Sequence, residues 1–328
     1  MHKVELDDAS WDTLQNTLGA SFLQSSGWAA FQSRLHVSTA RFHGDGWSAL
    51  CLEHTTPVGK YWYLPYGPTA TSDAVLVKAL KNIAAKAKAE HVTWLRVEPI
   101  NSTAKPLNKL FPAAVKTPQR LNPMHTICND LTEDEATMRS RLTPNKRNLV
   151  NRGTKRGLQF EESANPDDIA IFLDMMHEVE RRTGARFHEE QYYIEQAKEL
   201  MPKGMLTLEI ARGPENQPLS TTILVRYQGT ISRLYAASYQ EARKYEAGVG
   251  LDWHTMLAAK SAGLHTYDFF GAAAPDADEN DPYAGFTRYK AEFGGAYVTH
   301  GGTWDIPLDA KRYLLYTVLR RIQKLIKH

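Results

Sequence analysis

The stretch MLTLEIARGPENQPLSTTILVRYQGTISRLYAA, residues 205–237, decides the fold of this chain. It contains three runs rich in apolar and β-branched residues, separated by two turns that contain glycine. The runs are 205–211, 219–227 and 231–237, and the turns contain Gly213 and Gly229. Such runs are typical of consecutive antiparallel strands. A helical pattern and one more strand follow, so this part of the chain predicts a mixed α/β module.

The N-terminal third of the chain shows the same order of elements. We expect helices over 8–18, 26–34 and from Ser72 onward, and strands over 47–54, 60–64 and 92–97. In the second half, helices are expected over 167–183, 189–201 and 250–263, a strand over 266–270, and a helix over 283–293. Both halves therefore read as helices, antiparallel strands, helix and strand, which predicts an α/β (α+β) protein of two similar modules.

The last predicted helix, about 309–327, is amphipathic. Its apolar residues are expected to face inward and its basic residues outward. The apolar set is Leu315, Val318, Ile322, Leu325 and Ile326.

The composition excludes several classes of protein. The chain has 328 residues, 42% hydrophobic and 23% charged, with a net charge of +2 and two cysteines. These values exclude global disorder, a disulfide scaffold and a cysteine-rich zinc site. We find no signal peptide pattern and no apolar run long enough to span a membrane, and we expect a cytoplasmic protein without a metal site.

A basic run lies between Arg139 and Arg156. It holds seven basic residues and no acidic one, after a helix expected over 132–143 with Thr132 as cap and Pro144 as stop. A solvated charged face is the ordinary interpretation of such a run. The self-repulsion of unopposed cations equally favours a surface that meets phosphate, of a nucleotide sugar or of an RNA backbone.

Two further segments carry candidate chemistry. Residues 243–250 form a glycine-containing loop before a helix, an arrangement that suits a phosphate, although Tyr245 stands where acetyltransferase loops have Gln or Arg. Lys290 follows Tyr289 shortly before the pair Gly294–Gly295, which suggests either a surface lysine at a helix end or a charge that stabilises a reacting carbonyl. No hydrolase, nucleotide-phosphate or dinucleotide fingerprint occurs.

Eight segments, in order along the chain, resemble the motifs of the Fem family of tRNA-dependent aminoacyltransferases, which build peptidoglycan cross-bridges. They are FLQSSGWAAF (22–31), YLPYGP (63–68), RVEP (96–99), KRNLVNRGTKRG (146–157), TGAR (183–186), YDFFG (267–271), FTRYKAEFGG (286–295) and GTWD (302–305). The resemblance implies two GNAT-like acyltransferase domains with a cleft between them. It places 1–137 plus 303–328 in the first domain and 138–302 in the second, with no coiled-coil arm, as in the compact FemX type.

The resemblance also implies site residues. Lys290 matches the family lysine that acts on the tetrahedral intermediate, Glu98 the acid near the acceptor amine, and Tyr235 a cleft tyrosine. Residues expected to bind substrate are Arg186, Trp28, Gln32, Tyr289, Arg147 and Lys155. At Gln32 the family commonly has lysine, so either Arg34 compensates or the precursor is held differently.

The implied activity is transfer of an amino acid from aminoacyl-tRNA to the stem-peptide amine of a peptidoglycan precursor, lipid II or the UDP-MurNAc-pentapeptide. This is an aminoacyltransferase of cell-wall biogenesis and cell shape that needs no cofactor. A monomer is expected, and a lipid-linked acceptor would be compatible with peripheral contact with the membrane surface. The alternatives are an acyl-CoA-dependent N-acyltransferase on the same fold and a non-catalytic RNA-binding module using 139–156.

Overall fold

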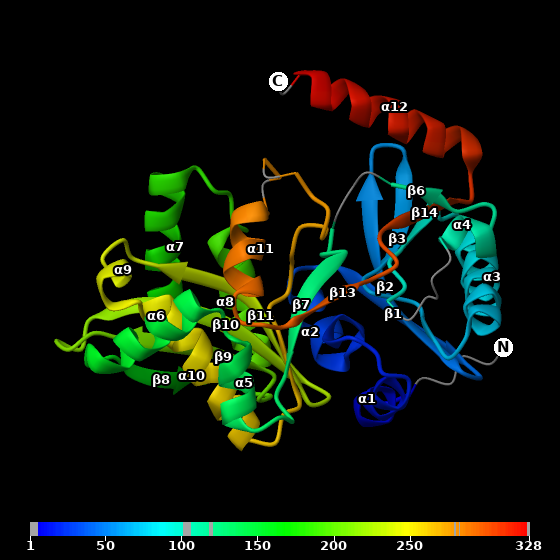
Figure 1. The fold of residues 1–328 in the computed structure, drawn as a ribbon. Helices are drawn as coiled ribbons and strands as arrows, with labels where there is room; N and C mark the ends of the chain where they lie inside the picture. Colours follow the sequence, from blue (N-terminus) through cyan, green and yellow to red (C-terminus); the bar gives the residue numbers. More distant parts are fainter. Residues whose placement is uncertain (1–5, 101–105, 118–120, 279, 282, 327–328) are drawn as a thin grey trace. The chain divides into compact units, whose positions relative to one another are not determined.

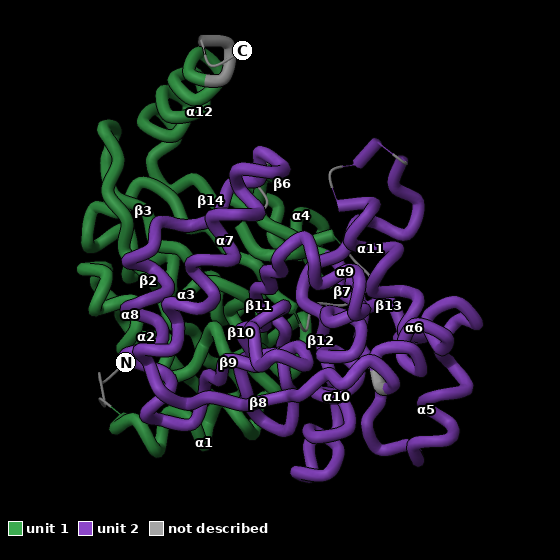
Figure 2. The backbone as a smooth tube through the Cα atoms, turned by 90° about the vertical axis from the view of Figure 1, so that its left-hand side faces the viewer, with its two compact units in different colours: residues 1–124, 300–328 green, residues 125–299 purple. Residues whose placement is uncertain are grey.

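The computed structural model describes residues 6–100, 106–117, 121–278, 280–281 and 283–326. The chain divides into two compact units (Figures 1 and 2). The first unit comprises 1–124 and 300–328, and the second comprises 125–299. The predicted boundary at 137 differs from this division because strand β7 (His125–Asp130) pairs with strands of the second unit.

The first unit is built on a mixed sheet in the order β1-β2-β3-β5-β14-β6, with β4 paired to β2. Its strands are β1 (Ser38–Gly44), β2 (Trp47–Thr56), β3 (Gly59–Leu64), β4 (Thr69–Ala70), β5 (Trp94–Val97), β6 (Val115–Lys116) and β14 (Trp304–Pro307). Its helices are α1 (Asp8–Thr17), the short η1 (Phe22–Gln24), α2 (Ser26–Arg34), α3 (Asp73–Ala89), α4 (Leu107–Leu110) and α12 (Ala310–Ile326).

Helix α3 and the sheet share the main core of the first unit. Ser72 caps the helix by accepting a hydrogen bond from the Val75 amide, as its sequence predicts. Leu80 and Ile83 on its apolar face pack with strand residues such as Trp47. The crossover through α3 makes β5 parallel to β3.

The second unit has a sheet in the order β13-β7-β12-β11-β10-β9-β8. Besides β7, its strands are β8 (Gln159–Ser163), β9 (Leu206–Arg212), β10 (Pro218–Tyr227), β11 (Thr230–Ser238), β12 (Thr266–Asp268) and β13 (Ala296–Thr299). Its helices are α5 (Glu135–Arg141), α6 (Pro144–Lys155), η2 (Pro166–Asp168), α7 (Ile169–Thr183), α8 (Glu190–Leu200), α9 (Ala242–Tyr245), α10 (Ala247–Ser261) and α11 (Ala284–Ala291).

The predicted strand series of 205–237 is confirmed as β9, β10 and β11, which pair antiparallel. Helix α10 then crosses over to β12, which lies parallel to β11. Met256 and Trp253 of this helix pack with strand residues such as Ile231. Each unit therefore contains a parallel strand pair joined by a helix, flanked by antiparallel strands, and this shared topology confirms the predicted α/β fold of two similar modules.

Three local expectations were wrong. Pro144 does not stop a helix but occupies the first turn of α6, where its missing amide costs nothing. The preceding helix is shorter than predicted and is capped by Asp134 rather than Thr132. The glycines at 248 and 250 lie inside the first turns of α10 rather than in a loop before it.

Helix α12 reverses the predicted orientation of its apolar side. Leu315, Val318 and Ile322 are 51%, 43% and 46% exposed instead of facing inward. Tyr313 and Tyr316 face the unit and pack on Trp94 of the sheet. The side chains of Leu325 and Ile326 lie outside the described set.

Candidate active site

In the first unit, a buried carboxylate stands at the carboxyl end of β5. Glu98 is 3% exposed and follows the last residue of that strand. Its Oε2 accepts hydrogen bonds from the Tyr63 hydroxyl (2.6 Å) and the Asn122 side-chain amide (2.8 Å), and its Oε1 accepts one from the Thr303 hydroxyl (2.7 Å). All three donors are neutral, so the carboxylate oxygens are satisfied by hydrogen bonds, and none of these partners is a cation.

The YLPYGP turn fixes the position of Glu98. The Glu98 amide donates to the carbonyl of Gly67 at 2.9 Å. A Cβ atom at Gly67 would lie 2.8 Å from Nε2 of Gln24, so only glycine fits without a shift. Gln24 in turn donates to the Pro65 carbonyl at 2.6 Å and accepts from the Leu50 amide at 2.7 Å. The first two motifs of the resemblance therefore contact each other and support the third.

In the second unit, Lys290 stands beyond the carboxyl end of β12. Its Nζ donates to the carbonyls of Phe270 (3.1 Å) and Gly271 (2.5 Å), and the residue is 7% exposed. Burial, followed by the positive charge of Arg233, lowers the pKa of Lys290 to about 7, while Asp268 and Asp252 act in the opposite direction. An amine with such a pKa can exchange a proton near neutral pH.

Asp252, inside α10, is the centre of the polar cluster beside Lys290. Its Oδ1 accepts from Arg233 Nε (2.8 Å) and from the Tyr267 hydroxyl (3.0 Å), and its Oδ2 accepts from the Tyr289 hydroxyl (2.6 Å). Asp252 is 1% exposed. Burial and the carboxylate of Asp252 raise the pKa of Tyr289 well above its ordinary value, so this tyrosine stays protonated and keeps donating.

Tyr289, expected to bind substrate, also contacts the basic run. Lys146 Nζ lies 3.9 Å from the centre of the Tyr289 ring and 4.8 Å from that of Phe293. Lys146 is 1% exposed and forms an ion pair with Glu292 at 3.0 Å. It therefore belongs to the interior around α11 and is not a free surface cation.

Two more cations of the basic run pair with acids. Arg141 pairs with Glu133, and Arg152 with Glu246 at 3.5 Å. Arg147, a predicted substrate-binding residue, donates instead to the carbonyls of Ser140 (3.0 Å) and Leu142 (3.1 Å). Three of the seven cations, Arg141, Lys146 and Arg152, therefore have an acidic partner in the folded chain. Lys155 lies exposed at the end of α6.

The remaining predicted residues are not members of the Lys290 cluster. Tyr235 on β11 belongs to an aromatic group: its hydroxyl donates to that of Tyr192 at 3.5 Å, and its ring meets Tyr193 edge-to-face at 5.0 Å. Trp28 and Gln32 are buried in α2 of the first unit, each 7% exposed. The Trp28 indole N–H has no hydrogen-bond partner among the described residues.

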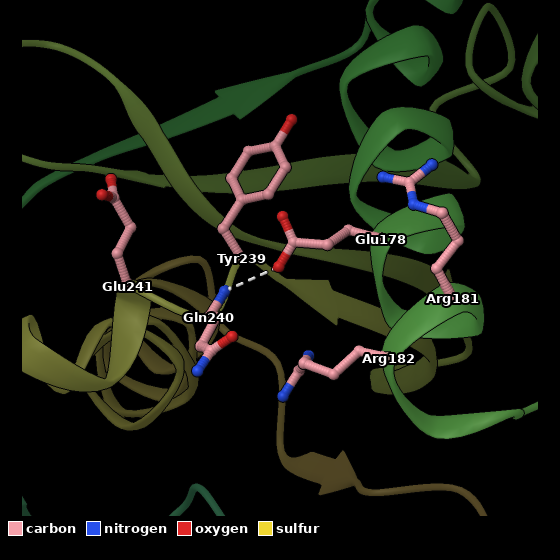
Figure 3. A pocket seen from close by; sticks show the side chains of 6 residues that line it. All are labelled: Glu178, Arg181, Arg182, Tyr239, Gln240 and Glu241. Carbon is pink, nitrogen blue, oxygen red and sulfur yellow. Dashed lines mark hydrogen bonds between the residues drawn. The ribbon is translucent and has the colours of Figure 1, made fainter.

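Arg186 is exposed in the segment between α7 and α8. The open depression near the end of α7, about 550 Å³, does not include it. The depression is lined by Glu178, Arg181, Arg182, Tyr239, Gln240 and Glu241. Figure 3 shows that three of these side chains come from α7 and three from the segment after β11, joined where Glu178 accepts from the Gln240 amide at 2.9 Å.

Sequence reasoning missed three members of the two clusters, namely Asp252, Arg233 and Asn122. Only Asp252 had a usable signal, because an acid between Leu251 and Trp253 in an apolar helix must find a buried partner. Among the described residues, no group of three or more His, Cys, Asp or Glu side chains could hold a metal ion, and no helix there is long and apolar enough to cross a membrane.

The fold defines a class, the proteins with two GNAT-like modules in one chain. A tandem GNAT protein from the clavulanic acid pathway aligns with a TM-score of 0.55 at 11% identity, covering 92% of this chain and 96% of that one. The L-PGS structure from Bacillus licheniformis aligns with a TM-score of 0.60 at 12% identity, covering 98% and 97%. These likenesses show a shared fold.

Among proteins of this fold, the FemAB family model matches residues 203–321, which confirms the Fem-family resemblance of the sequence. A crystal structure of FemX aligns with a TM-score of 0.85 at 17% identity, covering 96% of this chain and 99% of that one. No curated protein sequence matches the chain.

Proposed function

We propose that this protein transfers an amino acid from aminoacyl-tRNA to the stem-peptide amine of a peptidoglycan precursor. The FemAB family match supports a cross-bridge aminoacyltransferase in general terms. The observation that carries the proposal is Lys290, a buried lysine held by two main-chain carbonyls with a pKa lowered to about 7. A buried, rigidly held amine of this kind is what acyl transfer needs beside a reacting carbonyl.

In the proposed reaction, the acceptor amine attacks the ester carbonyl carbon. A C–N bond forms, the C–O bond to the tRNA ribose breaks, and the amine proton ends on the ribose oxygen. The ammonium form of Lys290 stabilises the oxyanion of the tetrahedral intermediate. Tyr289, anchored on Asp252, keeps α11 in the orientation that presents Lys290.

Glu98 has the complementary role in this proposal. A carboxylate anchors an acceptor ammonium group by charge and accepts its proton before attack. Because Tyr63, Asn122 and Thr303 already hold both oxygens, the carboxylate is fixed in one orientation without a competing cation among these partners. The acceptor is the lipid-linked or UDP-linked precursor, and Trp28, Gln32, Arg186, Arg147 and Lys155 remain candidates for binding it.

The test is transfer from a panel of charged tRNAs to purified precursor, with the mass of the product measured. We expect the native protein to give an aminoacylated precursor, and Lys290→Ala to lower kcat by about 100-fold or more, as for loss of an oxyanion-stabilising group. The variant should still bind tRNA. No product with any charged tRNA would overturn the proposal, and unchanged turnover by Lys290→Ala would remove the lysine from it.

A second candidate is an acyl-CoA-dependent N-acyltransferase. The first turns of α10, with Gly248 and Gly250, present amides of the kind that bind phosphate. However, Glu246 is the N-cap residue of this helix, and although its side chain makes no capping hydrogen bond, it brings a carboxylate paired with Arg152 to the start of the helix. Coenzyme A that raises the thermal unfolding temperature, while peptidoglycan precursor does not, would favour this candidate over the transferase.

A further inference from the structure

Helix α12 carries an apolar stripe that points into solvent. Ten large hydrophobic side chains of the described residues are exposed, and five of them lie on this one helix. We call these five the α12 stripe: Leu314, Leu315, Val318, Leu319 and Ile322, which are 38–64% exposed. A concentration of this kind marks an interaction surface, whereas single exposed apolar residues are ordinary.

The opposite side of the helix explains why the stripe faces outward. The Tyr313 hydroxyl donates to Asp305 at 2.9 Å, and the Tyr316 ring lies 4.4 Å from that of Trp94. Arg96 donates to the Tyr316 hydroxyl at 3.5 Å. At roughly 100° per residue, Tyr313 and Tyr316 lie on the side of the helix opposite the stripe. The tyrosine anchors therefore hold the helix on the first unit with its apolar face turned away from the sheet.

Charge identifies the partner. Residues 310–326 contain five basic residues and no acidic one. The exposed cations Arg312 and Arg321 fall on either side of the stripe, and Lys311 lies at its N-terminal end. Apolar side chains flanked by arginine and lysine fit the boundary between acyl chains and anionic headgroups of a bilayer. A protein partner that covered this surface would instead be expected to present acidic side chains to these cations.

We propose that α12 docks the protein on the surface of an anionic lipid bilayer. The helix lies in the plane of the interface, with the α12 stripe in the acyl boundary and Arg312 and Arg321 against lipid phosphates. In this contact the helix binds the surface of the bilayer and does not cross it. This contact goes beyond the proposed function, because it requires no transfer activity.

The experiment measures co-sedimentation of the full chain with vesicles. One set contains equal parts of phosphatidylcholine and phosphatidylglycerol, and the other contains phosphatidylcholine alone. We expect binding to the first set, weaker binding to the second, and a partial loss in high salt because headgroup attraction is screened. Absence of binding to the anionic vesicles would overturn the proposal.

Two matched double variants separate the stripe from net charge. Leu315→Glu with Ile322→Glu places two carboxylates in the stripe, and we expect the partition coefficient to fall by roughly tenfold or more because apolar burial is lost. Ala310→Glu with Gln323→Glu adds the same charge at exposed positions outside the stripe and should weaken binding less. Equal losses in the two variants would reduce the contact to electrostatics and contradict an inserted stripe.

Two further outcomes would assign the stripe to another partner. Sedimentation equilibrium that shows a dimer of the native chain, made monomeric by the stripe variant, would identify the stripe as a contact between copies. A stripe variant with a clearly lowered free energy of unfolding would show that the rest of the chain covers it. We expect a monomer and unchanged stability, since the substituted side chains are exposed.

Discussion

The side chains of Glu98 in the first unit and Lys290 in the second lie near the ends of corresponding strands but are held in opposite ways. Each stands where the second strand of a parallel pair ends, after β5 in one sheet and beyond β12 in the other. Neutral hydroxyl and amide donors surround the carboxylate, whereas carbonyls and a neighbouring arginine surround the lysine. The first arrangement holds the Glu98 carboxylate in one orientation, and the second lowers the pKa of the Lys290 amine.

The two environments differ because different charged residues lie near each parallel strand pair. In the first unit, the nearby charges pair with each other: Arg96 donates to both oxygens of Asp305 at 2.7 and 2.8 Å, both side chains being almost fully buried. In the second unit, Arg233 shares Asp252 with two tyrosines and also acts on Lys290. A shared fold thus supports two electrostatic environments, because the charged neighbours differ.

The largest effect is expected at the centre of the second cluster. Asp252→Asn removes the buried charge that pairs with Arg233, whose side chain is 15% exposed, and breaking a largely buried pair in this way costs about 3–5 kcal/mol in the free energy of unfolding. The measurement is chemical denaturation. Arg152→Ala is the matched control, because it breaks the exposed pair with Glu246 near the start of the same helix and should cost less than about 1 kcal/mol. Equal costs would mean that the Asp252 cluster is not a structural centre.

A smaller effect should appear as a pH dependence of stability. Between about 7 and 10.5, Lys290 has lost its proton in the folded protein and keeps it in the unfolded chain. The unfolded state then binds more protons, so the free energy of unfolding rises with pH across this window. We expect the native protein to gain stability relative to Lys290→Met as the pH rises from 7 to 10.5. Parallel stability curves would contradict a lowered pKa.

The smallest effect is expected at the carboxylate. Tyr63→Phe removes one donor from Glu98 but leaves Asn122 and Thr303 in place, so the free energy of unfolding should fall by about 1–2 kcal/mol. Tyr61→Phe, on the same strand, takes away a hydroxyl that does not contact Glu98 and should cost less. If the two variants are equally stable, the hydroxyl of Tyr63 contributes nothing to holding the carboxylate.

Local patterns predicted most elements of the fold. The strands of 205–237, the cap at Ser72 and the turn after Tyr63 were predictable because alternation, capping side chains and glycine–proline turns act over a few residues. The orientation of α12 was not predictable in this way. Its apolar periodicity was clear, but two tyrosines on the other side, packing on Trp94, decide which side meets the sheet.

The candidate site shows the same limit. Motifs located Glu98 and Lys290, yet the partners that set their chemistry are far away in sequence: Thr303 for Glu98 and Arg233 for Lys290. The basic run shows the same limit, since Glu246 and Glu292 pair with two of its members only after folding. Charge–charge neighbours over such separations have no periodic signature in a single sequence.

Strand β14 has a consequence for how the chain is made. It lies between β5 and β6, and its Asp305 completes the buried pair with Arg96 across more than 200 positions of sequence. During synthesis, the first sheet therefore lacks an internal strand until the whole second unit has left the ribosome. Residues 125–299 can fold as a continuous segment. Until β14 is available, the first sheet keeps an unpaired β5 edge, and Arg96 lacks the carboxylate of Asp305. The first unit is therefore the first to be synthesised and the last to complete its sheet.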